Sequence, residues 1–290
     1  METTGHSPCN TCGACCRSYI VPLNGRDVWE LCVHQRFDPS DFVTAFPLPK
    51  PSPEGFRLNK DGFTFGLALD KQGEFEFNRP CTFLMSLGGG HSCCGVYAHR
   101  PTVCRSYPVI RVREHFVQRK DSLCPPNAWS AGQLGHPSWR QNAQRVQMQF
   151  DLYYEVIARW NARVVSKPEG TTYVIGAYYD YLLNVYERLA GLDDALGEDT
   201  VERVVANWSS VPASGDFADE SIDRDQFPWL SYLSAAREVI DAFYPEVPSQ
   251  PSIVLHLVGR GARSNPPRKM IPDELLEPEP AAAMPAGSNG

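Results

Sequence analysis

Hydrophobic and polar positions divide the chain into an N-terminal part with strand-like alternation and a later part with helical periodicity. Phenylalanine and leucine alternate with smaller residues over residues 63–69, and phenylalanine alternates again over residues 75–77. The residues between them, Asp70-Lys71-Gln72-Gly73, have turn chemistry. This pattern predicts a β-hairpin, with Phe56-Arg57-Leu58 as a third strand.

The helices predicted from periodicity lie mostly after residue 130. Ser138 is an expected N-cap for a helix whose apolar positions recur at steps of three and four: Trp139, Ala143, Val146, Phe150, Tyr153, Ile157 and Trp160. A second helix is predicted from Val174, Tyr178, Tyr181, Val185 and Leu189, and two more over residues 199–210 and 227–244. At helical spacing these aromatic stripes are typical of a core rather than of a cofactor pocket.

Shorter elements complete the expected arrangement. Asn24 begins a helix with Val28, Leu31 and Cys32 on one face. Pro101 opens a short helical turn that Pro108 ends, residues 109–117 resemble one strand, and residues 252–258 a final strand. Residues 47–55, with four prolines, and the glycines at 88–90 are expected loops.

Together these patterns predict an α+β protein in which a small antiparallel sheet and an irregular cysteine-rich module pack against a mainly helical region. We expect a cysteine module over residues 1–130, the helical region over 131–262, and a disordered tail over 263–290, where Pro, Ala, Gly, Ser and Glu dominate.

The cysteines are confined to the first part of the chain. All ten lie between positions 9 and 124, and four of them fall within eight residues, Cys9-Asn10-Thr11-Cys12-Gly13-Ala14-Cys15-Cys16. The N-terminus has no secretory signal pattern, so we expect a cytoplasmic protein whose thiols stay reduced. In that setting such a cluster favours metal binding over disulfides.

The spacing of the cysteines constrains the site. Cys9, Cys12 and Cys15 are separated by two residues each, a spacing that lets thiolates bind one metal from a tight turn. Cys15 and Cys16 are adjacent, and in extended backbone their side chains would point to opposite sides. This favours either two neighbouring sites or one polynuclear cluster.

The remaining ligands must come from later in the chain, where Cys81, Cys93, Cys94, Cys104 and Cys124 are available. Eight cysteines would fill two four-ligand sites. The two left over fit Cys32 and one of the Cys93-Cys94 pair as ordinary buried thiols. Three histidines lie near cysteines, and we expect them at the surface rather than in the ligand set: His6, His91 and His99.

Charge distinguishes the two parts further. Residues 1–124 contain 14 Lys/Arg against 12 Asp/Glu, whereas residues 125–290 contain 13 against 22. Arginines near the cysteines could offset the negative charge of bound thiolates. No segment is basic enough to bind nucleic acid through its phosphates, and no apolar run is long enough for a membrane span.

Known motifs match only in part. The Cys9–Cys15 spacing equals the first three ligands of a bacterial ferredoxin run, but the fourth, Cys-Pro, is missing there. Cys32-Val33-His34 is a single copy of the Rieske ligand pair, which a Rieske centre needs twice. Cys12-Gly13-Ala14-Cys15 has thioredoxin spacing without the βαβ context.

Four motifs in order resemble the YkgJ-like cysteine cluster family: Cys-x2-Cys-Gly-x-Cys-Cys, Cys-x-Phe-Leu, Cys-x-Val-Tyr-x2-Arg-Pro-x2-Cys-Arg-x-Tyr-Pro and a late Cys. The resemblance covers about residues 9–124. It implies a zinc- or iron-chelating domain, and members are often labelled iron–sulfur oxidoreductases. A related cysteine pattern occurs in flagellin lysine methylases.

Carried over residue by residue, the resemblance implies eight metal ligands: Cys9, Cys12, Cys15, Cys16, Cys81, Cys94, Cys104 and Cys124. The resemblance also covers Arg100 and Arg105. We interpret both as residues outside the ligand set that donate hydrogen bonds to sulfur or to an acidic partner. Cys93 departs from the pattern, because a doubled cysteine could let the ligand slip by one position.

Three functions follow from this interpretation. The leading one is an iron or iron–sulfur protein with a redox or electron-transfer role, compatible with an oxidoreductase acting on a small molecule or a protein partner. The second is a structural zinc module that presents the helical region to a partner. The third, a methylase-like enzyme, has only the glycines at 88–90 as a candidate cofactor loop.

Overall fold

The computed structural model describes residues 12–73, 79–87, 91–112, 115–125, 128, 137–208 and 228–243. Four groups of sequence-based expectations lie outside these residues: Cys9 and His6; the strand at 75–77 and the loop at 88–90; the strand at 252–258; and the tail from 263 onward.

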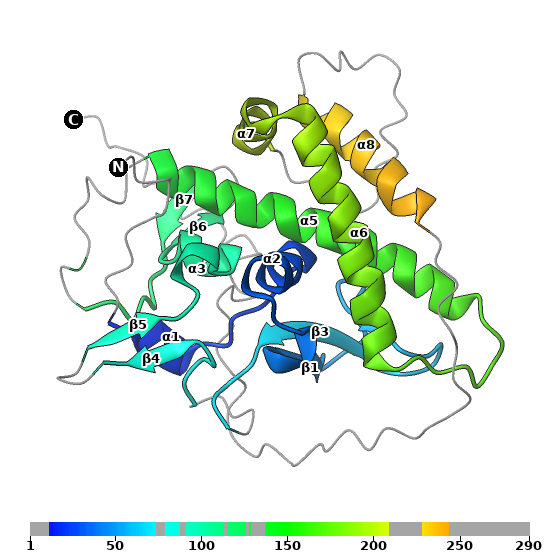
Figure 1. Cartoon of the computed structure of the whole chain (residues 1–290), viewed down its shortest axis with the longest axis horizontal. Coiled ribbons are helices and arrows are strands. Elements are labelled where there is room, and N and C mark those ends of the chain that lie inside the picture. Colours follow the sequence, from blue (N-terminus) through cyan, green and yellow to red (C-terminus); the bar gives the residue numbers. More distant parts are fainter. Residues whose placement is uncertain are drawn as a thin grey trace, which may run out of the picture.

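The architecture is α+β, as the sequence predicts (Figure 1). The helices are α1 (Ala14–Ser18), α2 (Gly25–Gln35), α3 (Thr102–Ser106), α5 (Pro137–Val165), α6 (Ile175–Leu196), α7 (Glu198–Ala206) and α8 (Pro228–Ala242), with 3-10 turns η1 (Pro39–Asp41) and η2 (Tyr97–His99). The strands are β1 (Val43–Pro47), β2 (Phe56–Arg57), β3 (Thr64–Leu69), β4 (Leu84–Ser86), β5 (Ser92–Cys94), β6 (Val109–Val112) and β7 (His115–Gln118).

The largest of the three described sheets has the strand order β1-β3-β2, with both pairs antiparallel. The strands predicted over residues 56–58 and 63–69 are therefore confirmed as β2 and β3, each one residue shorter than predicted. The pairing of β3 with β1 was missed, because Val-Thr-Ala-Phe-Pro shows no clear alternation and ends in proline. Residues 109–117 were predicted as one strand and instead form the hairpin β6–β7.

Helix α2 follows directly from its sequence. Asn24 is the N-cap, and its side chain accepts a hydrogen bond from the Asp27 backbone amide while Asp27 accepts one from the Asn24 amide. This reciprocal capping box satisfies two amides that would otherwise lack partners. Val28 and Leu31 are fully buried on the predicted face, whereas Cys32 is half-buried.

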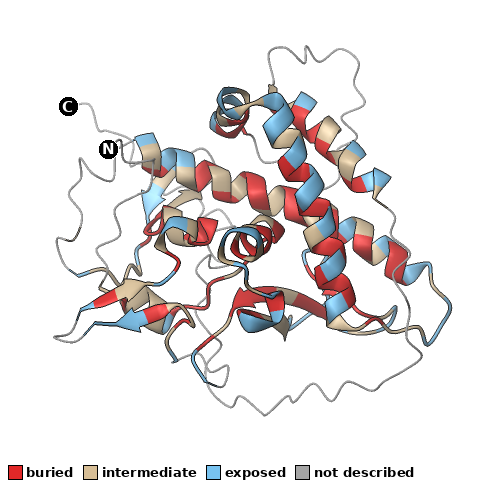
Figure 2. Cartoon of the chain, in the orientation of Figure 1, coloured by how far each residue is buried: buried red, intermediate tan, exposed pale blue. Residues whose placement is uncertain are grey.

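The long helices form a layer that covers the sheet and α2. Figure 1 shows α6 crossing α5, with α7 and α8 at one end of the pair. Buried positions form stripes along both helices in Figure 2, as the periodicity predicts. Ser138 lies inside α5 rather than before it, so the expected N-cap is wrong by at least one residue.

One hydrophobic core joins the cysteine-rich part to the helices. Phe56 of β2 stacks on Tyr178 of α6 with ring centroids 3.9 Å apart. The Trp160 indole nitrogen of α5 donates a hydrogen bond to the Arg57 carbonyl at 2.6 Å. The division of the chain at residue 130 stays a prediction, which the effect of metal removal on the helices would test.

Candidate metal centre

Eight of the nine described cysteines line one cavity of about 60 Å³: Cys12, Cys15, Cys16, Cys81, Cys93, Cys94, Cys104 and Cys124. This volume exceeds the roughly 10–15 Å³ that one water molecule needs. Seven of these cysteines belong to the predicted ligand set, whose eighth member, Cys9, lies outside the described residues. Cys32 does not line the cavity, in agreement with its predicted exclusion.

Backbone pairing brings the distant cysteine segments together. The Cys81 amide donates to the Cys16 carbonyl at 2.8 Å, which joins α1 to the segment after β3. Cys94 lies on β5, opposite Leu84 of β4. Cys104 lies on α3, which begins after Pro101 and ends before Pro108 as predicted.

A pair of tyrosines positions the segment that contains Cys124. The Tyr107 hydroxyl accepts a hydrogen bond from the Leu123 amide at 2.7 Å, and the Tyr19 hydroxyl donates to the Asp121 carbonyl at 2.6 Å. The two rings pack edge to face with centroids 5.7 Å apart. These contacts hold the last cysteine against the cavity without a regular element of its own.

The structure corrects the expected geometry of Cys15 and Cys16. Both lie on α1, a five-residue helix, and not in extended backbone. Their Sγ atoms are 4.0 Å apart. Two thiolates on one tetrahedral ion with metal–sulfur bonds of about 2.3 Å would be about 3.8 Å apart. The adjacency of the two cysteines therefore does not assign them to different sites, contrary to the expectation from the sequence.

The number of thiols at the cavity exceeds what one tetrahedral ion takes. One tetrahedral ion takes four ligands, whereas eight cysteines line this cavity. Among the described residues, no three Cys, His, Asp or Glu side chains already converge closely enough to enclose an ion. The cavity therefore gathers the thiols, and the ligand set itself stays a prediction.

The thiols differ sharply in acidity. A hydrogen bond from Cys15 is the main cause that lowers the pKa of Cys16 to about 7, helped by the charges of Lys71, Arg100 and Arg17 against the effect of burial. Burial raises the pKa of Cys81 to about 12 and also raises that of Cys104. Of these three thiols Cys16 ionises most easily, and metal binding would have to displace the protons of Cys81 and Cys104.

Three cationic side chains surround these sulfurs. Arg100 is buried, lines the cavity, and lies over the Tyr97 ring at 4.0 Å. Arg17 donates to the Cys12 carbonyl and to the Ser92 hydroxyl at 3.3 and 2.8 Å. Lys71 is only 3% exposed. Buried cations beside thiols fit a site that holds net negative charge, as metal-bound thiolates do.

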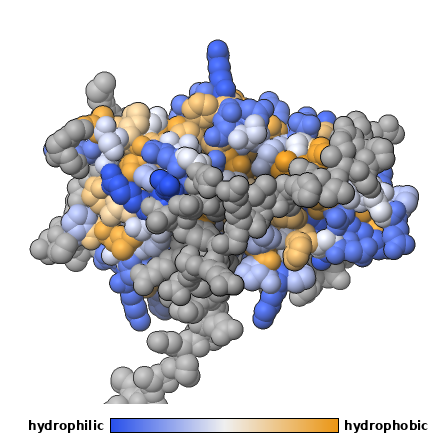
Figure 3. All heavy atoms as spheres, turned by 90° about the horizontal axis from the view of Figure 1, so that it is seen from below, coloured by the Kyte–Doolittle hydropathy of each residue, from blue (hydrophilic) through white to orange (hydrophobic). Residues whose placement is uncertain are grey.

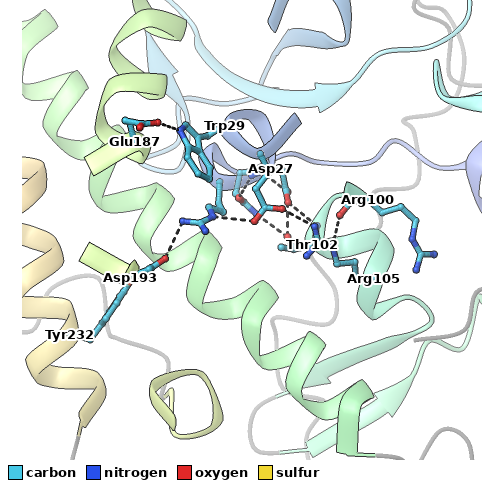
Figure 4. A network of polar contacts seen from close by, with 11 residues as sticks. Asp27, Trp29, Arg100, Thr102, Arg105, Glu187, Asp193 and Tyr232 are labelled. Atoms are coloured by element: carbon cyan, nitrogen blue, oxygen red, sulfur yellow. Dashed lines mark hydrogen bonds and ion pairs between the residues drawn. The ribbon is translucent and has the colours of Figure 1, made fainter. Parts of the chain in front are cut away.

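Arg105 has a different role from Arg100. It donates to the Arg100 carbonyl and forms an ion pair with Glu30 of α2 at 2.7 Å, so its partner is acidic rather than sulfur. Figure 4 shows the Arg100 guanidinium extending away from this network. Burial would raise the pKa of Glu30, but Arg105 and Arg26 hold it below its ordinary value.

The same network continues into the helices (Figure 4). Arg26 of α2 pairs with Asp193 of α6 at 3.0 Å, and the Tyr232 hydroxyl of α8 donates to Asp193 at 2.7 Å. A continuous series of charged contacts therefore links α8 to α3, the helix that contains Cys104.

Cys32 and the histidines have other surroundings. Burial and the nearby Asp38 and Asp41 raise the pKa of Cys32 to about 12. His91 is exposed, and His99 stacks on His34 with ring centroids 4.6 Å apart. Neither His91 nor His99 lines the cavity.

Gly13 is expected to be essential for this geometry. It caps α1 with φ 71°, and a Cβ there would lie 2.4 Å from Arg17 Nη1 and 3.2 Å from Ser92 Cβ. Gly13→Ala should lower metal affinity about tenfold, because backbone strain and a displaced Arg17 would shift Cys15 and Cys16. Competition with a chelator measures this affinity.

Gly170→Ala is the matched control for that substitution. Gly170 has φ 82°, and nothing lies within 4 Å of the position that a Cβ would take, so alanine there has the same backbone strain without a clash near the cysteines. Equal losses of metal affinity in both variants would contradict the expectation.

Asp27 should make stability depend on pH. Its side chain is buried, and burial raises its pKa to about 7, although the Thr102 amide donates to it at 2.7 Å. The folded protein therefore binds this proton more tightly than the unfolded chain does. Its contribution to stability is full below about pH 4 and is lost as the pH rises to about 7, by about 4 kcal/mol.

Asp27→Asn removes this contribution, so the stability difference between wild type and variant should favour wild type more at pH 5 than at pH 8. Unfolding by urea at a series of pH values measures it, and Asp61→Asn at an exposed position is the control. Parallel stability curves for wild type and Asp27→Asn would contradict the assignment.

Comparison with known proteins identifies the class of domain. Residues 8–125 match the family model CxxCxxCC, described as a "putative zinc- or iron-chelating domain". The match covers the cysteine-rich part of the chain and confirms the resemblance that the sequence motifs indicate over those residues. No curated protein and no solved structure matched the chain.

None of the described helices is long and apolar enough to cross a membrane. On the face drawn in Figure 3, hydrophobic residues occur in small groups between hydrophilic ones.

Proposed function

We propose that this domain binds iron, as an iron–sulfur cluster or as iron ions, through Cys9, Cys12, Cys15, Cys16, Cys81, Cys94, Cys104 and Cys124, and serves electron transfer or a redox reaction. The observation that carries the proposal is that thiols from distant segments line one cavity, in a number that exceeds what one tetrahedral ion takes. Iron bound there would supply one-electron chemistry.

Cys94 rather than Cys93 is the proposed ligand of the doubled pair. The two alternate along β5, so their side chains point to opposite faces of the hairpin. The charge of Cys94 acts on the thiols of both Cys81 and Cys104, two other members of the proposed ligand set.

The surroundings of the cavity favour a redox centre. Its walls include Val21, Leu69, Phe83, Leu84 and Val96, which lower the local dielectric constant. Charges and burial around a cluster are the features by which a protein sets its reduction potential. Arg17 and Arg100 supply positive charge that would stabilise the reduced, more negative state.

Anaerobic purification tests the proposal directly. Iron and acid-labile sulfide assays, with visible absorption that bleaches on reduction by dithionite, are the expected result. A colourless protein with about two zinc ions per chain and no response to dithionite would reject iron and redox chemistry.

A structural zinc module is the second candidate. The core shared by the cysteine-rich part and the helices favours it, because closed zinc sites commonly stabilise small folds of this kind. The same assays separate the candidates, since zinc has no redox chemistry.

A further inference from the structure

Lys71 is a charged residue that is buried beside Cys81, one of the cysteines that line the cavity. Leu67 and Leu69 point into the core from β3, and Lys71 takes the next position of the same alternation. It forms an antiparallel bridge with Cys81 and is only 3% exposed. The fold therefore places an ammonium group where a third aliphatic side chain would be expected.

The surroundings of this ammonium contain thiols rather than carboxylates. Nζ donates one hydrogen bond, to the Tyr19 carbonyl at 2.6 Å. Four cysteines act on its charge: Cys81, Cys16, Cys104 and Cys15. Among the described residues, no ion pair joins Lys71 to Asp or Glu. Burying an ammonium group without a nearby anion costs several kcal/mol of folding free energy, so a negatively charged partner is expected for Lys71.

Metal-bound thiolates would be that partner. Eight thiolates on two divalent ions leave a formal charge of about −4, and four thiolates on one divalent ion leave about −2. Either arrangement places negative charge on Cys81, which lies directly opposite Lys71 in the antiparallel bridge, so that the two side chains are on the same face. Metal binding therefore increases the negative charge beside Lys71.

We infer that Lys71 is the buried counter-ion of the metal-bound thiolates, a positioning residue that favours the loaded centre over the metal-free one. The inference rests on the proposed metal centre, but holds for iron and for zinc. This inference distinguishes Lys71 from a residue that only packs. Loss of the Lys71 charge should raise the stability of the metal-free protein and lower that of the metal-loaded protein.

Lys71→Met tests this inference, since methionine keeps the length and loses the charge. The melting temperature of the metal-free protein should rise by about 3 °C or more, because a buried cation is removed. That of the loaded protein should fall, and metal affinity measured against a chelator should decrease at least about tenfold. Lys71→Arg, which keeps the charge, should recover part of the affinity.

Lys50→Met, at an exposed position, is the matched control and should change none of these quantities. If Lys71→Met lowers the melting temperatures of both states alike, Lys71 has a packing role and the inference is wrong. A metal affinity of Lys71→Met within twofold of wild type would also overturn the counter-ion inference, but it would not contradict the proposed metal centre. A wild-type chain that takes up neither iron nor zinc would overturn both.

Discussion

Cys16→Ser is expected to abolish stable metal binding and to lower the melting temperature of the loaded protein by more than about 10 °C. The pKa of Cys16 is lowered to about 7, whereas the pKa values of Cys81 and Cys104 are raised, so Cys16 is the proposed ligand of these three that loses its proton most easily. Its charge also acts on Cys81 and Cys104. Serine keeps the shape but is a poor ligand for a soft metal site.

The measurement is metal per chain after anaerobic reconstitution and desalting, together with the melting temperature. Cys32→Ser is the matched control, because Cys32 is half-buried on α2 and does not line the cavity. This control should retain the wild-type metal content. Retention of full metal content by Cys16→Ser, or loss of metal in Cys32→Ser, would show that the centre is not built around this cavity.

The elements that the sequence predicts well are those in which local chemistry and packing agree. Helix α2 has its capping box and its buried stripe, and α5 and α6 have long runs at helical spacing. Strand β3 has clear alternation. In the helices one face is buried over several turns, so the helical period appears in the sequence. Strand β3 is buried on both faces, and its alternation is one of large with small side chains.

The elements that were missed are too short for a period to appear. Helix α1 has five residues and no fully buried ones, and its conformation follows from Gly13 at its N-terminus and from the Cys16–Cys81 backbone bond. The division of residues 109–118 into β6 and β7 does not appear in the hydrophobic pattern of these short strands. Tertiary pairing decides these segments, and one sequence does not show it.

The cysteine positions were readable because their spacing is itself chemical information. The residues that surround the cysteines were harder to predict from the sequence. Arg100 was found through its motif and lines the cavity, whereas Arg105 of the same motif pairs with Glu30. Lys71 was missed as a site residue, since it reads as part of a turn. Its place in the alternation after Leu67 and Leu69 was the signal that could have found it.

The shared core has a consequence for metal removal. The Tyr173 amide donates to the Leu58 carbonyl at 2.8 Å, and the Trp29 indole of α2 donates to Glu187 of α6 at 2.8 Å. With the stacking of Phe56 on Tyr178, these contacts join the cysteine-rich part to α6 at several points. A structural change at the centre should therefore reach the helices.

Removing the metal with a strong chelator under reducing conditions is thus expected to destabilise the whole described part of the chain in one transition. Binding of structural zinc contributes about 10–16 kcal/mol in small zinc domains, so even a fraction of this would lower the melting temperature by more than about 10 °C. Far-UV circular dichroism reports the helices, and tryptophan fluorescence, to which the buried Trp160 contributes, reports the core. The two signals should change together, and adding metal back should restore both. If the helical signal kept its original melting temperature after chelation, the parts before and after residue 130 would be independent domains, and the shared core would contribute little to their coupling.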